Sequence, residues 1–168
     1  MPAILFVCTA NQFRSPLAAA CFSSMIDRQN LGEEWLVESA GTWTQEGMPA
    51  LSIAQKNAER LGIQGLELHR SRQVNAGLLV GYDLIVVMES GHKEALVAEF
   101  KAVQSRIYML SEIIDGIQYD IPDPVSPGNH PQDISSELHS MIKLGADKII
   151  GLARLLHSAR IADQQGNS

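Results

Sequence analysis

Residues 3–22 read AILFVCTANQFRSPLAAACF, and this stretch indicates the class of fold. Residues 3–7 are all apolar, which is typical of a strand buried on both faces of a parallel sheet. A polar loop follows, and Pro16 suits the first turn of a helix. From Leu17 to Ile26, apolar residues recur on one helical face. The stretch therefore predicts a buried strand, a short loop and an amphipathic helix.

The rest of the chain continues this alternation. We expect strands at Trp35–Val37, Asp83–Met88 and Arg106–Leu110, and helices at about Ala50–Leu61, at His92–Phe100 and over residues 138–156. Four prolines place residues 122–131 in a loop, and residues from about 159 to 168 are expected to form a polar tail that is frayed from about Asp163. The pattern predicts a single α/β domain over residues 1–168. In it, a four-stranded parallel sheet carries helices on both faces, in three layers.

Composition narrows the class of protein further. The 168 residues suit one domain, and the net charge of −6 argues against a general nucleic-acid binder. Two cysteines are too few for a disulfide-built fold, which indicates a reducing compartment. The N-terminus lacks a basic leader, and no apolar run reaches the roughly 18 residues of a membrane span. We therefore expect a cytoplasmic protein without nucleic-acid or membrane partners.

The loop between the first strand and the first helix carries the chemistry. Cys8 stands at the carboxyl end of the strand, where active sites of parallel sheets lie, and Arg14 follows after five residues. Backbone N–H groups of Thr9, Ala10, Asn11, Gln12 and Phe13, together with the helix dipole, can surround an anion. The same field favours the thiolate of Cys8. Arg14 can donate two parallel bonds to phosphate oxygens, and the Ser15 hydroxyl can steady the thiolate.

An isolated cysteine is more often a buried core thiol than a nucleophile. Here the strand, the five-residue spacing, Arg14 and the helix start act together, and they favour a cysteine nucleophile in a phosphate-binding loop. Hydrolysis of a phosphate ester also needs a proton for the leaving oxygen. Asp123, held between Pro122 and Pro124, is the candidate acid, with Asp120 as the second choice.

These residues together resemble the low-molecular-weight protein tyrosine phosphatase family. The resemblance extends over nearly the whole chain, through residues 7–16, 37–42, 69–73, 82–89 and 123–124. It implies a cysteinyl-phosphate intermediate on Cys8, with Asp123 first donating a proton and then activating water. It also implies that Asn11, Ser15, Ser39 and His69 support the phosphate loop through hydrogen bonds, without a metal or other cofactor.

Several positions depart from the usual family pattern. Ala10 replaces a glycine, which would cost about 1 kcal/mol if that position required a positive φ. Phe13 replaces a second cysteine in the loop. Gln12, Trp43 and Val125 are the expected substrate-lining residues, and Val125 stands where many members carry an aromatic side chain. The catalytic residues thus match the family, whereas the substrate-lining residues leave substrate choice open.

The leading hypothesis is a phosphatase that acts on phosphotyrosine in proteins and is inhibited by inorganic phosphate and other oxyanions. A protein-arginine phosphatase on the same fold is the first alternative, and it would need a carboxylate near the loop for the guanidinium. A thiol arsenate reductase is disfavoured because no cysteine follows Cys21. A non-catalytic phosphoprotein-binding module is disfavoured by the joint presence of Cys8, Arg14 and Asp123. No Cys/His cluster has the spacing of a zinc site.

Overall fold

The computed structural model describes residues 1–31 and 34–167. Its strands are β1 (Ala3–Cys8), β2 (Leu36–Gly41), β3 (Leu84–Val87) and β4 (Ile107–Met109). The α-helices are α1 (Arg14–Arg28), α2 (Ser52–Arg60), α3 (Ala76–Leu79), α4 (Ser90–Glu99), α5 (Leu110–Asp115) and α6 (Pro131–Gly166). Two short 3-10 helices, η2 (Leu66–Leu68) and η3 (Lys101–Arg106), complete the described elements.

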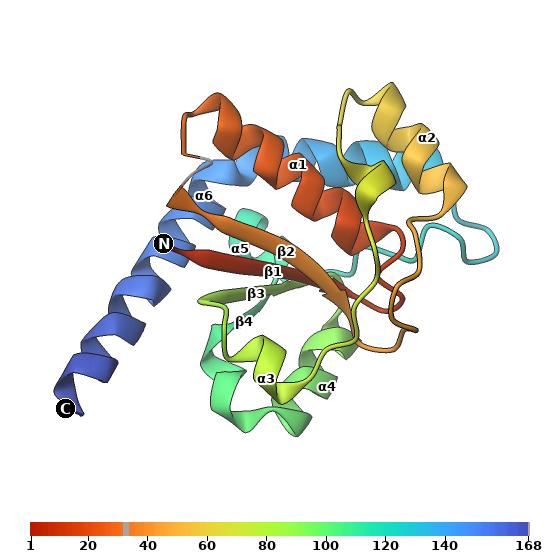
Figure 1. Ribbon diagram of the computed structural model, residues 1–168. Coiled ribbons are helices and arrows are strands. Elements are labelled where there is room, and N and C mark those ends of the chain that lie inside the picture. The colour runs from red at the N-terminus through yellow and green to blue at the C-terminus, as the bar shows by residue number, and fades with distance from the viewer. Residues whose placement is uncertain (32–33, 168) are drawn as a thin grey trace.

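The four strands form one parallel sheet in the order β2-β1-β3-β4. Side chains alternate across β1, so that Ile4 and Phe6 enter one core and Leu5 and Val7 enter the other. Helices α1 and α6 cover the first face, and α3 and α4 cover the second (Figure 1). Continuous burial of β1 explains its unbroken apolar sequence. The expected three-layer α/β architecture is confirmed.

Most expected elements are present, with differences at their ends and in the short helices. Strand β2 runs past the expected Trp35–Val37 segment and includes residues 39–41, where we expect it to end, because it pairs with β1 along its whole length. Helices α3 and α5 were not expected, since each is too short to show a helical apolar period. The loop over residues 122–131 is present as far as residue 130, and α6 begins at Pro131.

The frayed C-terminal tail is a wrong prediction for the described residues. Helix α6 continues to Gly166. Its last turns are held because His157 Nδ1 and Arg160 NH1 each lie 3.0 Å from a carboxylate oxygen of Asp83, which is 2% exposed. The polar character was correctly anticipated, because the side chains of residues 161–167 are exposed. Ser168, the last residue of that predicted tail, lies outside the described residues.

The order of the strands places a crevice at the carboxyl end of β1. The chain moves from β1 to β2 on one side and then to β3 on the other side. The loops that follow β1 and β3 therefore leave the sheet in opposite directions. In open α/β sheets, ligands usually bind in the crevice between two such loops. Cys8 is the last residue of β1, and Gly41 is its partner at the end of β2. The predicted nucleophile therefore stands at this crevice.

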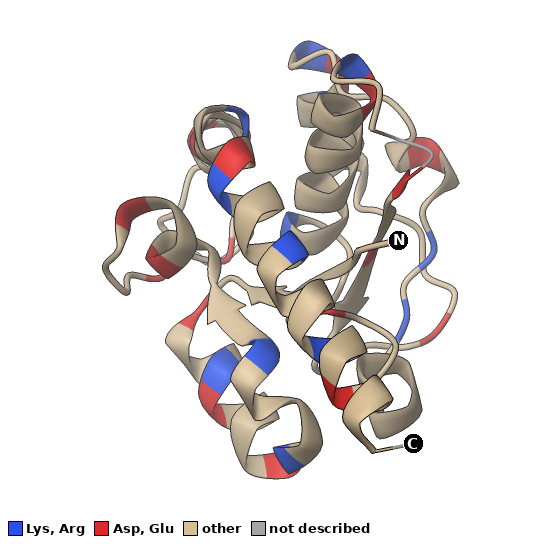
Figure 2. Cartoon of the chain, turned by 90° about the vertical axis from the view of Figure 1, so that its left-hand side faces the viewer, with Lys and Arg blue, Asp and Glu red and all other residues tan. Residues whose placement is uncertain are grey.

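Charged residues of both signs are interspersed along α6 and its neighbours, on the face that Figure 2 shows. Among residues 1–31 and 34–167, no helix combines the length and the apolar character that a membrane span requires.

Candidate active site

The loop after β1 brings the thiol of Cys8 to the hydroxyl of Ser15. The Cys8 Sγ and Ser15 Oγ atoms are 3.0 Å apart, and both residues are buried. Ser15 Oγ accepts a hydrogen bond from Asn11 Nδ2 at 2.8 Å, so its own hydrogen is left for another partner. That hydrogen can point to Cys8 Sγ or to the Ala40 carbonyl oxygen, 3.3 Å away. The shorter contact suits a hydroxyl that donates to a thiolate.

Asn11 organises the loop from its centre. Its backbone has φ 55°, and its side chain is fully buried. The side-chain amide donates to Ser15 Oγ and to Ser39 Oγ, at 2.8 and 2.9 Å, and Oδ1 accepts from the Arg72 amide at 2.9 Å. His69 Nε2 lies 2.6 Å from the Asn11 carbonyl oxygen. Because a carbonyl oxygen can only accept, His69 Nε2 is the donor of this hydrogen bond, and burial lowers the pKa of the ring. The support expected of Ser39 and His69 is thus present as direct contacts with Asn11.

The other loop residues occupy different environments. Ala10 is exposed, and the positive φ belongs to Asn11, a residue type that tolerates it; the expected cost of alanine at position 10 does not arise. Gln12 Nε2 donates to the Pro49 carbonyl at 3.1 Å and so points along the rim of the loop. Phe13 is 5% exposed and belongs to the core beneath α1.

Arg14 is held by groups from two distant segments. It is 3% exposed, and its NH1 donates to the Ile121 carbonyl at 2.8 Å and lies 3.3 Å from Glu89 Oε1. A buried guanidinium needs such partners, because its charge has lost the solvation of water. The contact with Ile121 also ties the phosphate loop to the proline-rich loop that carries Asp123.

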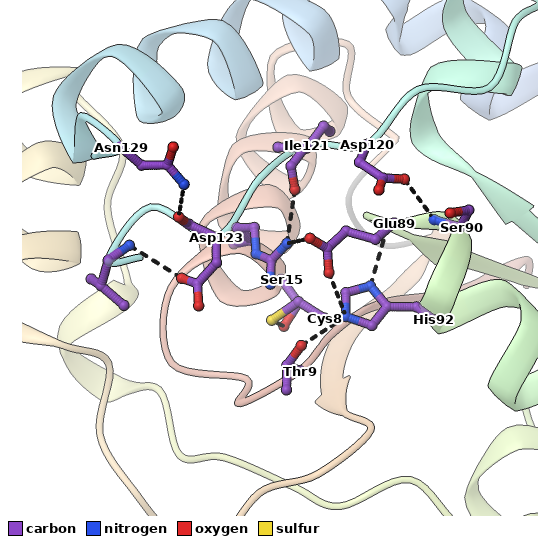
Figure 3. A network of polar contacts seen from close by, with 12 residues as sticks. Cys8, Thr9, Ser15, Glu89, Ser90, His92, Asp120, Ile121, Asp123 and Asn129 are labelled. Carbon is purple, nitrogen blue, oxygen red and sulfur yellow. Dashed lines mark hydrogen bonds and ion pairs between the residues drawn. The ribbon is translucent and has the colours of Figure 1, made fainter. Parts of the chain in front are cut away.

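Glu89 and His92 form a second polar group beside the loop (Figure 3). Glu89 Oε2 lies 3.3 Å from His92 Nε2, and that nitrogen lies 2.8 Å from Thr9 Oγ1. His92 Nδ1 accepts from the Glu89 amide at 3.2 Å. Burial, followed by the positive charge of Arg14, lowers the pKa of His92 to about 4. The ring is therefore neutral near pH 7, and Nε2 carries its hydrogen.

Sequence reasoning assigned no role to Glu89 or His92. Glu89 comes two residues after β3, which lies next to the strand that ends at Cys8. An ionisable residue at the carboxyl end of a neighbouring strand was the signal that could have identified it. Asp120, the second candidate acid, accepts a hydrogen bond from the Ser90 amide at 2.8 Å and so is engaged at the start of α4.

Asp123 lies in the loop that passes over the phosphate loop (Figure 3). Its Oδ1 accepts from the Val125 amide at 3.1 Å, and its carbonyl accepts from Asn129 Nδ2 at 2.7 Å. Within the described residues, its Oδ2 has no hydrogen-bond partner. The Ile121 amide donates to the Met88 carbonyl at 2.9 Å, which fixes the start of this loop at the crevice. One carboxylate oxygen is thus fixed, while the other is open for proton transfer.

The expected substrate-lining residues reach the site mainly through their backbones. The Trp43 amide donates to the Thr9 carbonyl at 3.0 Å, but the Trp43 side chain is 85% exposed. Val125 is 52% exposed. Neither residue forms a closed wall around the phosphate loop in the described structure. A substrate side chain would meet Trp43 as an exposed aromatic surface beside the loop.

In residues 1–31 and 34–167, no group of three or more His, Cys, Asp and Glu side chains is arranged to hold a metal ion. Cys21 is buried in α1, and its burial raises the pKa of the thiol to about 12. Cys21 is therefore a neutral core thiol at physiological pH.

Comparison with protein families identifies the class of protein that this fold and site define. Residues 3–158 match the family described as low molecular weight phosphotyrosine protein phosphatase. The chain belongs to this family.

Individual relatives include two kinds of phosphatase. A protein-arginine-phosphatase of Geobacillus stearothermophilus is 33% identical over 147 residues, which cover 87% of this chain and 95% of that protein. A human low molecular weight phosphotyrosine protein phosphatase is 32% identical over 125 residues, which cover 72% of this chain and 78% of that protein. A solved structure of a YwlE mutant from Bacillus subtilis matches with a TM-score of 0.80 at 28% identity, covering 89% of this chain and 99% of that one.

Proposed function

We propose that this protein hydrolyses phosphotyrosine in protein substrates through a cysteinyl-phosphate intermediate. The observation that carries the proposal is the contact of 3.0 Å between Cys8 Sγ and Ser15 Oγ, in a loop that the buried Arg14 closes. A phosphorylated protein is the implied partner, and inorganic phosphate and related oxyanions are the expected inhibitors. Two free cysteines are consistent with a cytoplasmic location.

In the first step, the Cys8 thiolate attacks phosphorus. A P–S bond forms, and the bond between phosphorus and the phenolic oxygen breaks. The electron pair of that bond goes to the leaving oxygen, and Asp123 supplies the proton that makes it a neutral phenol. Arg14 and the loop amides balance the charge on the phosphoryl oxygens.

In the second step, water regenerates the enzyme. The Asp123 carboxylate accepts a proton from water, whose oxygen attacks phosphorus while the P–S bond breaks. The electron pair returns to sulfur, and the Ser15 hydroxyl stabilises the thiolate that forms. Inorganic phosphate is released, and Asp123 is again protonated for the next turnover.

Hydrolysis of phosphoarginine is a second candidate function. The protein-arginine-phosphatase relative matches over 87% of this chain. The guanidinium of that substrate requires a carboxylate near the loop, and the open oxygen of Asp123 is such a group. Against it, the exposed Trp43 beside Thr9 offers an aromatic surface that suits a phosphotyrosine ring.

A panel of phosphotyrosine, phosphoserine and phosphoarginine peptides, with Cys8→Ser as the control, tests both candidates. Higher kcat/KM for phosphotyrosine would support the main proposal, and higher kcat/KM for phosphoarginine would replace it with the second candidate. Turnover of neither substrate would favour the non-catalytic binding module. Reduction of arsenate would indicate the thiol reductase, which the inert environment of Cys21 does not favour.

A further inference from the structure

A cavity lies beside β2, and neither Cys8, Arg14 nor Asp123 lines it. Its volume is about 720 Å³, and its walls are the outer side of α1, the free edge of β2 and the segment over residues 62–72. We call it the β2-edge cavity. Leu68 lines it and is 79% exposed, so an apolar side chain is available to a ligand.

The backbone of β2 offers unpaired hydrogen-bonding groups to this cavity. Leu36 donates to the Pro2 carbonyl on the β1 side, whereas the Gly41 amide donates to Arg72 and the Gly41 carbonyl accepts from Val74 on the opposite side. Because these directions alternate along a strand, the N–H and C=O groups of Val37 and Ser39 point away from β1. Among the described residues, these groups have no hydrogen-bond partner.

An unpaired strand edge is a template for an extended peptide, which adds to the sheet through main-chain hydrogen bonds. Residues 72–74 already pair with this edge at Gly41, and the Gly41–Gln73 bridge is parallel. The open positions Val37 and Ser39 continue the same edge within the cavity. The cavity is thus shaped for a short segment in strand conformation.

The charges around the cavity favour an acidic segment. Its charged lining consists of Asp27, Arg28, Glu38, Arg70 and Arg72. Arg72 pairs with Glu38 at 3.0 Å, so these two charges balance each other. The remaining charged side chains of the lining are Arg28 and Arg70, which are positive, and Asp27, which is negative. This local excess of positive charge occurs in a chain with a net charge of −6. A carboxylate on the bound segment would meet that excess.

The same cavity reaches the supports of the phosphate loop. Ser39, His69 and Arg72 line it, and each of these three residues makes a hydrogen bond with Asn11. A segment that pairs with Ser39 therefore contacts residues that position Asn11. Among the described residues of the loop, Asn11 is the one with a positive φ. The hydrogen bonds from these three residues to Asn11 therefore connect binding in the cavity with the geometry of the phosphate loop.

We propose that the β2-edge cavity binds an extended, acidic segment of a partner protein as an additional strand on β2, and that binding is transmitted to the phosphate loop through Asn11. The main-chain groups of Val37 and Ser39 provide the strand pairing. Arg28 and Arg70 select acidic side chains. The partner segment requires no phosphate, so this site is separate from the proposed catalytic site and does not depend on its activity.

The test uses a fluorescein-labelled, end-blocked hexapeptide of alternating valine and glutamate, added to the full chain at low salt. We expect saturable binding by fluorescence anisotropy, and slower hydrogen exchange at the Val37 and Ser39 amides by at least about tenfold. The side-chain amide resonances of Asn11 should shift on binding. A hexapeptide with lysine in place of glutamate should bind more weakly.

Two variants separate strand pairing from charge. Val37→Pro removes the outward N–H from an edge strand, where proline is tolerated, and should abolish the peptide complex. Arg28→Gln should weaken binding by up to about fivefold, with the loss shrinking at high salt. Lys101→Gln, a change on the exposed surface of η3, is the matched control and should bind as the parent does.

Three results would overturn the proposal. The first is no saturation up to about 1 mM peptide. The second is equal binding by the parent, Val37→Pro and Arg28→Gln proteins. The third is complete competition by inorganic phosphate, which would place the peptide in the phosphate loop instead. Binding that leaves the Asn11 resonances unchanged would overturn the transmission to the loop.

Discussion

At the scale of single residues, the proposed chemistry depends first on Cys8. Cys8→Ser should reduce turnover of aryl phosphates by at least about a thousandfold, because a serine hydroxyl in place of the thiolate is a poor nucleophile and a poor leaving group. Binding of inorganic phosphate should persist, because Arg14 and the loop amides are unchanged. Calorimetry with phosphate and a continuous aryl phosphate assay provide the two measurements. Substantial turnover by the serine variant would contradict a cysteinyl-phosphate intermediate.

Asp123 can be tested through the leaving group. Asp123→Asn should slow aryl phosphates with high leaving-group pKa by about 10²- to 10⁴-fold, because the asparagine cannot donate the required proton. Phenols of low pKa leave without that proton, so their loss should be much smaller. A plot of log kcat/KM against leaving-group pKa measures this difference. If the loss is uniform along the series, Asp123 has a structural role and Asp120→Asn becomes the next variant to measure.

Glu89 is the residue whose role only the three-dimensional structure indicates. Glu89→Gln should lower kcat/KM by about tenfold, because Arg14 loses its charged partner at 3.3 Å while the size of the side chain is kept. The dissociation constant of inorganic phosphate should rise with it, which separates a displaced Arg14 from a general loss of folding. Glu94→Gln, an exposed change on α4, the helix that follows Glu89, is the control. Unchanged phosphate binding in Glu89→Gln would argue against a positioning role.

The site residues divide according to how far apart they lie in the chain. Cys8, Arg14 and Ser15 could be predicted because one local segment, strand–loop–helix, fixes their relation. Asp123 was proposed from its two flanking prolines taken together with the Cys8 loop, and its role as the acid stays a prediction. Glu89 and His92 were not, because their contacts with Arg14 and Thr9 arise from the pairing of β1 with β3, which no local pattern records. Their role depends on tertiary neighbours that the sequence does not name.

At the scale of elements, the start of α4 contains a pH-dependent cap. His92 Nδ1 accepts from the Glu89 amide, and protonation of that nitrogen would break the contact. Burial and Arg14 lower the pKa of His92 to about 4, and the nearby Asp120 opposes the shift. An unfolded histidine takes up its proton near pH 6.5. Between these values the unfolded state binds more protons, so acid destabilises the folded state.

The free energy of unfolding should therefore fall as the pH decreases from 6.5 towards 4, with His92 contributing about 3 kcal/mol over that window. Urea unfolding at a series of pH values measures this slope. His92→Gln should remove much of it, because glutamine carries no titratable group. His130→Gln, at an exposed histidine, serves as the control. An equal slope in parent and His92→Gln proteins would contradict the cap.

The elements also show where sequence patterns are informative. The strands β1 and β3 were predicted well, because burial on both faces makes each a continuous apolar run. Helix α6 was predicted from its apolar period, but its end was not. Beyond Leu156 the sequence is mostly polar, and the helix is held by ion pairs with a residue more than 70 positions away. Periodicity reports hydrophobic packing and does not report such polar anchors.

At the scale of the whole molecule, α6 joins the last part of the chain to the amino ends of β1 and β3. The buried carboxylate of Asp83 accepts from the Ala3 amide at 2.8 Å and pairs with His157 and Arg160. The N-terminal amine lies 3.5 Å from His157 Nε2. This cluster lies at the amino-terminal ends of the strands, whereas Cys8 lies at the carboxyl end of β1. It therefore serves stability, and the phosphate loop serves catalysis, at separate ends of the same strands.

Removal of residues 157–168 should lower the stability of the protein without changing its catalysis. Asp83 would then keep only the Ala3 amide as a hydrogen-bond donor among the described residues, and a buried carboxylate that loses its contacts with His157 and Arg160 is costly. We expect the free energy of unfolding in urea to fall by about 3 kcal/mol. Removal of residues 163–168 alone keeps both ion pairs and should change it by less than about 0.5 kcal/mol.

A further variant distinguishes the lost ion pairs from the lost helix surface. Adding Asp83→Asn to the shorter chain replaces the buried charge by a neutral amide, so it should recover part of the lost stability, whereas the same change in the full chain should be destabilising. Turnover per folded molecule should stay the same in all of these proteins, because the cluster lies at the far end of the sheet from Cys8. Equal stability of the two truncated chains would show that Asp83 does not depend on α6.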